Sequence, residues 1–287
     1  MRPQAAAIKS LLDQRGLNIM PGCGDGMGAR LIEEAGFRIG FVSGSSIAAM
    51  RLAMPDMDLL TFPEMADAVE ACIAAAPNVL WLADGDTGYG NALAVQKTIG
   101  TYACRGAAAV LIEDKAWPRP LGHSGAKLVI ERDAAIVRCR AAVEACRDEG
   151  ILLLARTDAR VSRGFDEALA RLKAFEAEGA DILFLDSPQS EVELREAVAA
   201  CNGKPALAVA SPAGRHFMPG DAELERLGVK LVVYPQEILA ATVHAMRSAL
   251  AGLRGGAKPP MASPAELATA IRATDYLARD ARWPDPR

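Results

Sequence analysis

Eight short apolar runs recur along the chain, and longer stretches with helical periodicity separate them. The runs are apolar throughout rather than alternating with polar residues, which is typical of parallel strands buried on both faces of a sheet. We therefore predict strands at residues 17–20, 38–43, 78–83, 108–113, 151–156, 181–186, 206–210 and 230–234.

The stretches between these runs predict helices. Phe165, Leu169, Leu172 and Phe175 recur at the spacing that places side chains on one face of a helix. Glycines in "AEGAD" and "ERLGVK" end two helices just before the next strand. Eight strand–helix units in 287 residues favour an α/β fold, a single (β/α)8 TIM-type barrel over residues 1–287, with a doubly wound sheet as the alternative.

The end of the chain departs from this repeat. A Gly- and Pro-rich linker at 252–266 separates a helix near 236–251 from a last helical segment at 264–280. A barrel does not need such an extension. We therefore expect the helical tail at 252–287 to pack on a neighbouring subunit.

Composition argues against several classes of protein. A net charge of −4 is unusual for a nucleic-acid-binding protein, and no apolar run approaches the ~18 residues of a membrane span. The N-terminus lacks the apolar core of a signal peptide. Six scattered cysteines without a CxxC pair, with only three histidines, predict reduced thiols and no zinc site. We expect a cytoplasmic protein that binds neither nucleic acid nor membrane.

Carboxylates gather where the predicted strands end. Asp84 and Asp86 follow the third run, and Glu113 ends the fourth. In a barrel these ends meet at one mouth, where acids repel each other unless a cation joins them. Oxygen ligands favour Mg²⁺ or Mn²⁺, and two acids one residue apart along a strand point the same way. The alternative is that Asp84 caps the next turn and Asp86 is solvated.

Arg156 is a positive charge at the end of the fifth apolar run. A guanidinium binds carboxylate or phosphate through two parallel hydrogen bonds, so Arg156 indicates recognition of an anionic substrate. The alternative is a salt bridge from Arg156 to Asp158 or Glu113.

Residues 113–130 are the longest loop-like segment, with a Trp, several prolines, glycines and basic residues, and His123. A loop of this length after the fourth strand is a candidate lid over the mouth, and a plain surface loop is the alternative. The glycine-rich stretch at 20–30 lacks the spacing of a dinucleotide or Walker site, so we predict a tight turn capped by Asp25. His216 and Cys23 are weaker candidates for the mouth.

Several motifs resemble the isocitrate lyase and phosphoenolpyruvate mutase superfamily. They occur in the order of that family over about residues 8–250: "PGCGDGMGARLIEEAGF", "FVSGSS", "MPDMDLLTFPEM", "DGDTGYGN", "IEDKAWPRPLGH", "ARTDA", "EGADILFLDS" and "LGVKLVVYP". The resemblance implies a (β/α)8 barrel whose eighth helix is swapped between paired subunits, in a homodimer or homotetramer. It also implies an Mg²⁺ site that binds a small α-keto or α-hydroxy carboxylate.

The same resemblance implies roles for residues within these motifs. Asp84, Asp86 and Glu113 would hold Mg²⁺ directly or through water, with Asp56 in the outer shell. The substrate carboxylate would bind to Ser43, Gly44 and Ser45, with Asp86 close to the substrate. Arg156 would stabilise substrate or enolate oxygens. Residues 115–127 would form a mobile gate that brings Lys115 or His123 toward the substrate.

Departures from the family pattern decide between its reactions. The carbon–carbon lyases carry a gate cysteine that protonates the released enolate, and here Leu121 takes its place before Gly122 and His123. The phosphonate enzymes carry a second gate lysine, and here Arg119 replaces it. The resemblance thus favours an oxaloacetate decarboxylase, or a 2-alkylmalate or methylisocitrate lyase in which His123 is the acid. A phosphonopyruvate hydrolase or mutase and a non-catalytic metabolite-binding barrel remain as alternatives.

Overall fold

The computed structural model describes residues 1–118, 127–210, 217–256 and 258–283. Its centre is a parallel sheet whose strands follow one another in the order β6-β5-β4-β3-β2-β1-β8-β7. These strands are β1 (Asn18–Cys23), β2 (Ile39–Val42), β3 (Leu80–Asp84), β4 (Ala109–Glu113), β5 (Leu152–Thr157), β6 (Ile182–Leu185), β7 (Leu207–Val209) and β8 (Leu231–Tyr234). Each overlaps one of the apolar runs from which a strand was predicted.

The sheet closes into a barrel between its two outer strands. Leu183 of β6 pairs in parallel with Ala206, and its N–H donates to the Pro205 carbonyl oxygen at 3.0 Å. The predicted (β/α)8 barrel is therefore confirmed, and the doubly wound sheet, which would leave both edges open, is wrong.

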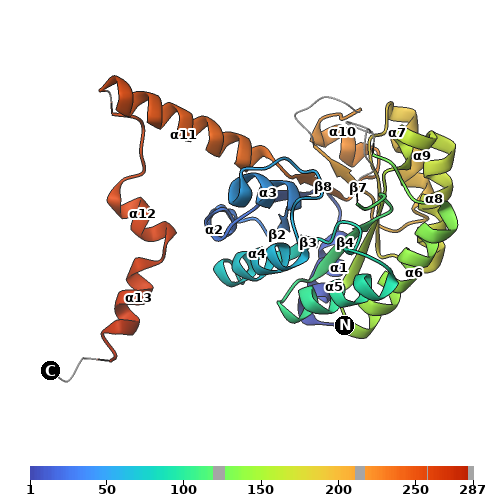
Figure 1. Cartoon of the computed structure of the whole chain (residues 1–287), viewed down its shortest axis with the longest axis horizontal. Helices are drawn as coiled ribbons and strands as arrows, with labels where there is room; N and C mark the ends of the chain where they lie inside the picture. Colours follow the sequence, from blue (N-terminus) through green and yellow to red (C-terminus); the bar gives the residue numbers. More distant parts are fainter. Residues whose placement is uncertain (119–126, 211–216, 257, 284–287) are drawn as a thin grey trace.

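Helices surround the strands on the outside of the barrel (Figure 1). The structure has α1 (Pro3–Leu12), α2 (Gly26–Glu34), α3 (Gly44–Leu52), α4 (Phe62–Ala75), α5 (Ala92–Cys104), α6 (Arg132–Glu149), α7 (Ala159–Arg163), α8 (Phe165–Glu178), α9 (Glu191–Ala200) and α10 (Asp221–Arg226). As predicted, Asp25 caps α2, since its side chain accepts the Gly28 N–H at 2.6 Å. Within the described ranges, no helix has the length and apolar character to cross a membrane.

The hydrophobic core has an inner and an outer layer. The inner layer fills the barrel with side chains such as Met20, Leu82 and Leu111, and Ile8 and Leu12 of α1 pack against it. The Arg2 N–H donates to the Gly150 carbonyl and Lys9 forms a salt bridge with Asp181, both just before a strand, so α1 covers the amino end of the barrel. The outer layer joins the strands to their helices, as Trp81 and Phe175 illustrate. The carboxyl end of the barrel is therefore the end that can hold a functional site.

The C-terminal helices leave the barrel. α11 (Glu237–Gly255) runs away from β8 and is followed by α12 (Pro264–Ala270) and α13 (Ala273–Asp280) (Figure 1). The predicted segments need correction at two points. α11 continues through Gly255, into the predicted linker, and the last segment breaks into two helices next to Arg272, whose φ is +52°. No residue of these three helices is buried within the chain.

Candidate active site

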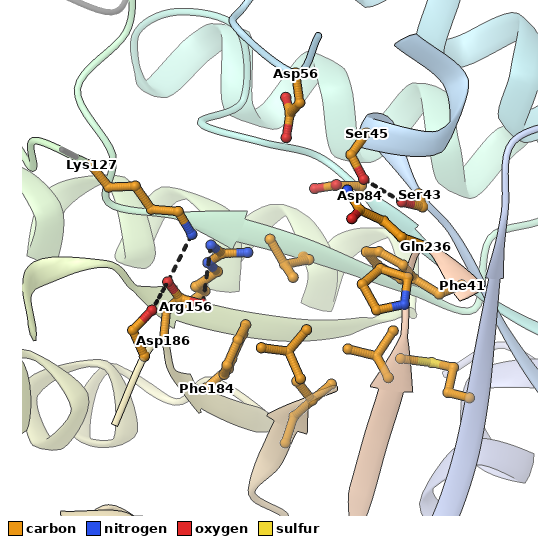
Figure 2. A pocket seen from close by; sticks show the side chains of 17 residues that line it. Phe41, Ser43, Ser45, Asp56, Asp84, Lys127, Arg156, Phe184, Asp186 and Gln236 are labelled. Carbon is orange, nitrogen blue, oxygen red and sulfur yellow. Dashed lines mark hydrogen bonds and ion pairs between the residues drawn. The ribbon is translucent and has the colours of Figure 1, made fainter. Parts of the chain in front are cut away.

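A cavity of about 340 Å³ opens at the carboxyl end of the barrel (Figure 2). Lys127, Arg156 and Asp186 lie on one side of it, and Ser43, Ser45, Asp84 and Gln236 lie across from them. Apolar side chains of the barrel interior complete the lining: Met20, Phe41, Leu111, Phe184, Leu207, Val209 and Val233. The cavity is therefore polar on two opposing sides and apolar elsewhere.

The serine side of the cavity is built where β2 passes into α3. Ser43 is the N-cap of α3, and its Oγ lies 3.4 Å from the Ser46 nitrogen and 3.0 Å from the Ser45 Oγ. The Gly44 N–H donates to Oδ2 of Asp84 at 3.2 Å. A Cβ on residue 44 would lie 3.1 Å from that oxygen, so glycine lets the helix start approach the carboxylate. The structure thus brings Ser43, Gly44, Ser45 and Asp84 together, as predicted.

Asp86 lies beside Asp84 but faces a smaller hollow next to the cavity. Its backbone has a φ of +48°, and its N–H donates to Oδ1 of Asp84 at 3.2 Å. Its Oδ2 accepts a hydrogen bond from the Tyr89 hydroxyl at 3.0 Å. Gly44, Asp86 and Tyr89 line this hollow, and Asp56 lines both the hollow and the main cavity. Asp56, Asp84 and Asp86 therefore surround neighbouring spaces at the mouth.

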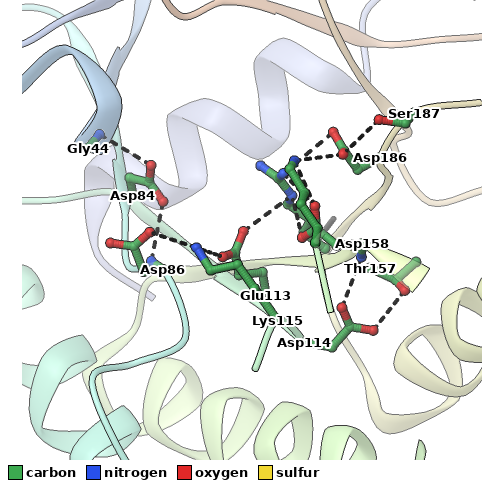
Figure 3. A network of polar contacts seen from close by, with 12 residues as sticks. Gly44, Asp84, Asp86, Glu113, Asp114, Lys115, Thr157, Asp158, Asp186 and Ser187 are labelled. Carbon is green, nitrogen blue, oxygen red and sulfur yellow. Dashed lines mark hydrogen bonds and ion pairs between the residues drawn. The ribbon is translucent and has the colours of Figure 1, made fainter. Parts of the chain in front are cut away.

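Lys115 sits among the acids rather than in the lining of the main cavity (Figure 3). Its Nζ lies 2.9 Å from Glu113, 3.4 Å from Asp58 and 4.0 Å from Asp86. Burial favours the neutral amine, but the charges of Glu113 and Asp86 prevail and hold the pKa of Lys115 above its ordinary value. In this arrangement Lys115 is a counter-charge for the acidic cluster, and its approach to a substrate stays a prediction.

Arg156 makes the salt bridges that were the alternative to substrate recognition, and it also faces the cavity. It lines the cavity, and it forms the predicted salt bridges, with Nε 2.9 Å and Nη2 2.7 Å from the two oxygens of Asp158. Its Nε also lies 3.3 Å from Glu113, and its Nη2 lies 3.5 Å from Asp186. The guanidinium carbon is 5.0 Å from the centre of the Phe184 ring. Arg156 is therefore held in place on several sides.

Lys127 shares the counter-ions of Arg156. Its Nζ lies 2.8 Å from Asp158 and 2.7 Å from Asp186, and the side chain lines the cavity. Burial alone would raise the pKa of Asp158, but the charges of Arg156 and Lys127 outweigh it and keep the pKa well below its usual range. Asp158 is therefore a carboxylate in the folded protein.

The donor chemistry of Asp84, Asp86 and Glu113 fits a hard divalent cation. Burial and the charges of Glu113 and Asp56 raise the pKa of Asp84 to about 6, and burial and Asp84 raise the pKa of Asp86. In the part of the chain that the structure describes, no three Asp, Glu, His or Cys side chains converge on one point. Mg²⁺ keeps several waters and takes one or two carboxylates, so such an open set of acids suits Mg²⁺ or Mn²⁺.

Two groups of residues complete the comparison with the predicted site. His123, Leu121 and His216 lie outside the described residues, as does the stretch 119–126 of the predicted gate. On either side of that stretch, the Ala116 N–H donates to the Leu128 carbonyl at 2.8 Å.

The other group consists of two residues at the site that the sequence analysis did not single out, Lys127 and Asp58. Lys127 fell inside the predicted gate, and its position at the far end of a mouth loop was the signal that would have identified it. Asp58 lies two residues after Asp56, a spacing that the pair Asp84 and Asp86 had already marked as informative.

A closed β/α barrel with a polar cavity at its carboxyl end has the architecture of an enzyme that acts on small molecules. This chain belongs to the phosphoenolpyruvate phosphomutase family, whose sequence pattern matches residues 8–254. It is 35% identical to 2,3-dimethylmalate lyase of Eubacterium barkeri over 84% of this chain and 83% of the relative. It is 40% identical to oxaloacetate decarboxylase of Paraburkholderia xenovorans over 67% of this chain and 64% of the relative.

Solved structures agree with this assignment. Oxaloacetate acetylhydrolase bound to 3,3-difluorooxalacetate superposes with a TM-score of 0.91 at 30% identity, covering 97% of this chain and 96% of the other. Phosphonopyruvate hydrolase bound to oxalate and Mg²⁺ superposes with a TM-score of 0.86 at 26% identity, covering 98% and 99%. The predicted superfamily, and the prediction that the protein is an enzyme, are therefore confirmed.

Proposed function

We propose that this protein is an Mg²⁺-dependent carbon–carbon lyase that acts on a small 2-oxo or 2-hydroxy dicarboxylate through an enolate. Its reaction would be that of an oxaloacetate decarboxylase, or of a 2-alkylmalate or methylisocitrate lyase. The observation that carries the proposal is the cavity itself, which sets Arg156 opposite Asp84 and the two serines across a space of about 340 Å³. A compact acid with charge at both ends fits such a space.

The metal is part of this proposal. Asp84, Asp86 and Glu113 would hold Mg²⁺ or Mn²⁺ directly or through water, with Asp56 in the outer shell. The oxalate and Mg²⁺ in the solved phosphonopyruvate hydrolase complex support this choice of ion. When bound, the ion would withdraw electron density from the 2-oxo oxygen of the substrate.

Different residues would bind the substrate carboxylate and stabilise the charge that develops during the reaction. Ser43, Ser45 and the first N–H groups of α3 would bind the substrate carboxylate, since a helix N-terminus attracts negative charge. Arg156 would donate hydrogen bonds to oxygen as negative charge develops there. Because Asp158 already orients the guanidinium, little reorganisation is needed during the reaction.

Among the candidate reactions, decarboxylation requires the fewest catalytic groups, because solvent can protonate the enolate. The C3–C4 bond of a 2-oxo-dicarboxylate breaks, carbon dioxide leaves, and the bonding electrons form the enolate, whose C3 then takes a proton from solvent. Phe184, Leu207, Val209 and Val233 give the cavity an apolar side, where a leaving carboxylate is poorly solvated. The substitution of Leu121 for the gate cysteine supports this reading over a reaction that needs a cysteine proton.

We also propose that the C-terminal helices pack on another copy of the chain in a homodimer or homotetramer. Leu250 and Leu253 of α11 are 67% and 69% exposed, and Leu277 of α13 is 68% exposed. Three successive helices without a buried residue gain little from their own barrel. A second copy would cover these side chains.

A substrate panel tests the proposed reaction. The purified protein with Mg²⁺ is offered oxaloacetate, 2-methylisocitrate, 2,3-dimethylmalate and phosphonopyruvate, and the release of pyruvate and phosphate is followed. We expect EDTA-sensitive pyruvate release from at least one of the three carbon substrates. Pyruvate with phosphate from phosphonopyruvate alone would select the phosphorus–carbon reaction instead. Ligand binding without any turnover would select a binding protein.

A further inference from the structure

A buried ion pair lies behind the side of the cavity that carries Arg156. Arg171 of α8 is 1% exposed, and its Nη1 lies 3.1 Å from Oδ2 of Asp114. Its Nε donates to Glu167 of the same helix at 2.7 Å. Glu167 and Asp114 therefore fix the guanidinium of Arg171 from two sides, although Arg171 does not line the cavity.

Both carboxylate oxygens of Asp114 accept hydrogen bonds from the carboxyl end of β5 and the residue after it (Figure 3). Oδ1 accepts the Asp158 N–H at 2.9 Å, and Oδ2 accepts the Thr157 hydroxyl at 2.7 Å as well as Arg171. These contacts fix the backbone at Thr157 and Asp158, the two residues that follow Arg156 in the sequence. They therefore also set the position from which the Asp158 carboxylate reaches Arg156.

We propose that Arg171 and Asp114 are positioning residues for Arg156. The path runs from the outer helix α8 through Asp114 to Asp158, and from the Asp158 carboxylate to the Arg156 guanidinium. This inference rests on the proposed function, in which Arg156 binds an oxygen that becomes negative during the reaction. Neither Arg171 nor Asp114 touches the substrate.

Unlike an ordinary structural ion pair, the pair of Arg171 and Asp114 should affect the position of Arg156 when it is removed. Without Arg171, the buried carboxylate of Asp114 loses the guanidinium that lies 3.1 Å from its Oδ2, so it should move toward other polar partners or water. A displaced Asp114 carboxylate no longer accepts hydrogen bonds from both the Asp158 N–H and the Thr157 hydroxyl in their present geometry. The clamp on Arg156 then loosens, and misplacement of a catalytic group by about 1 Å can cost about 100-fold in rate.

The test compares three variants, with the substrate that the panel identifies. Arg171→Met should lower kcat by about 10- to 100-fold and kcat/KM by a similar factor, because Arg156 acts on the transition state. Arg171→Lys keeps the charge near Asp114 and should recover part of this loss. Leu172→Ala, a buried apolar change on the same helix, should lower the melting temperature but leave kcat near the wild-type value.

A double variant separates positioning from loss of stability. Once Asp158→Asn has broken the clamp, adding Arg171→Met should lower kcat little further, whereas independent effects would multiply. Multiplying effects, or the same kcat in Arg171→Met and Leu172→Ala, would overturn the proposal.

A crystal structure of Arg171→Met distinguishes failure of this inference from failure of the proposed function. We expect the two hydrogen bonds between Arg156 and Asp158 to be lost or displaced. If they persist unchanged, the positioning role is wrong even where the wild-type protein is an active lyase. If they are lost while the wild-type protein turns over none of the panel, the path is real and the proposed function is wrong.

Discussion

Asp158 holds Arg156 through two hydrogen bonds, at 2.9 Å from Nε and 2.7 Å from Nη2. Only Thr157 lies between the two residues in the sequence, at the junction of β5 and α7. Because two parallel contacts fix the plane of the guanidinium, its orientation toward the cavity is set before a substrate arrives. The clamp does not use Nη1, which leaves that nitrogen as a donor for a substrate oxygen.

The shape of this clamp predicts that a lysine cannot replace Arg156. Arg156→Lys keeps the charge but loses the planar fork, so kcat should fall by about 100-fold, as when one preorganised oxyanion donor is removed. The control is Arg160→Lys, because Arg160 makes a similar two-point contact with Glu193 outside the cavity. Equal activity of the two variants in the pyruvate assay would show that Arg156 is not a substrate contact.

Asp84 is expected to couple metal binding to pH. In the metal-free protein the pKa of Asp84 is raised to about 6, against about 3.9 in an unfolded chain. Between these values the folded state binds more protons than the unfolded state, so the contribution of Asp84 to the free energy of unfolding falls as pH rises. This loss should reach about 1 to 3 kcal/mol by pH 7.

Mg²⁺ should reverse this loss, because it needs the ionised carboxylate. We predict that the increase in melting temperature caused by Mg²⁺ grows as pH rises through about 6 and is much smaller in Asp84→Asn. The variant should also lose activity. Thermal unfolding at several pH values, with EDTA or with Mg²⁺, measures the effect. If Mg²⁺ raises the melting temperature by the same amount at pH 5 and pH 7.5, or by the same amount in Asp84→Asn, Asp84 is not the ligand.

Tyr89 is expected to increase the affinity of the site for Mg²⁺ through its hydrogen bond to Asp86. Its hydroxyl donates to Oδ2 of Asp86 at 3.0 Å and so orients that carboxylate. Tyr89→Phe should weaken Mg²⁺ binding by about tenfold, the usual scale for a partner of a metal ligand. The metal dependence of turnover gives the apparent affinity. Tyr276→Phe is the control, since Tyr276 is exposed on α13, and an equal effect of both changes would exclude the role.

The apolar face of α11 predicts an assembly. Leu250→Glu combined with Leu253→Glu places two charges on that face and should lower the molar mass measured by light scattering. Val192→Glu on α9 is the control, because Val192 is similarly exposed on the barrel surface. A monodisperse monomer of the unaltered full-length chain would refute the assembly outright.

The barrel was predictable because its signal is local and repeated. Each strand is an apolar run with both faces buried, as the fully buried residues of β4 illustrate, and eight such runs leave few other architectures. The boundaries at the C-terminus were less predictable. The break at Arg272 depends on a positive φ, for which no glycine or proline provides a signal.

The site was predictable in its residue types but not in its contacts. Asp84, Ser43 and Arg156 follow apolar runs, so their place at the mouth could be read from the strand ends. Lys115 carried the same signal, yet its Nζ turns to Glu113 and Asp58. The pairing of Arg171 with Asp114 joins residues 57 positions apart. Such contacts depend on how α8 packs against β4 and β5, which no local pattern encodes.

The central claim is that Asp84 and Arg156 act on one bound carboxylate from opposite sides of one cavity. A crystal structure of the protein with Mg²⁺ and oxalate, a planar mimic of the enolate of pyruvate, tests it most directly. We predict that the ion binds against the Asp84 carboxylate and that oxalate lies between the ion and Arg156, still clamped by Asp158, with one end at Ser43 and Ser45. An ion bound away from Asp84, or oxalate bound without contact to Arg156, would contradict the account.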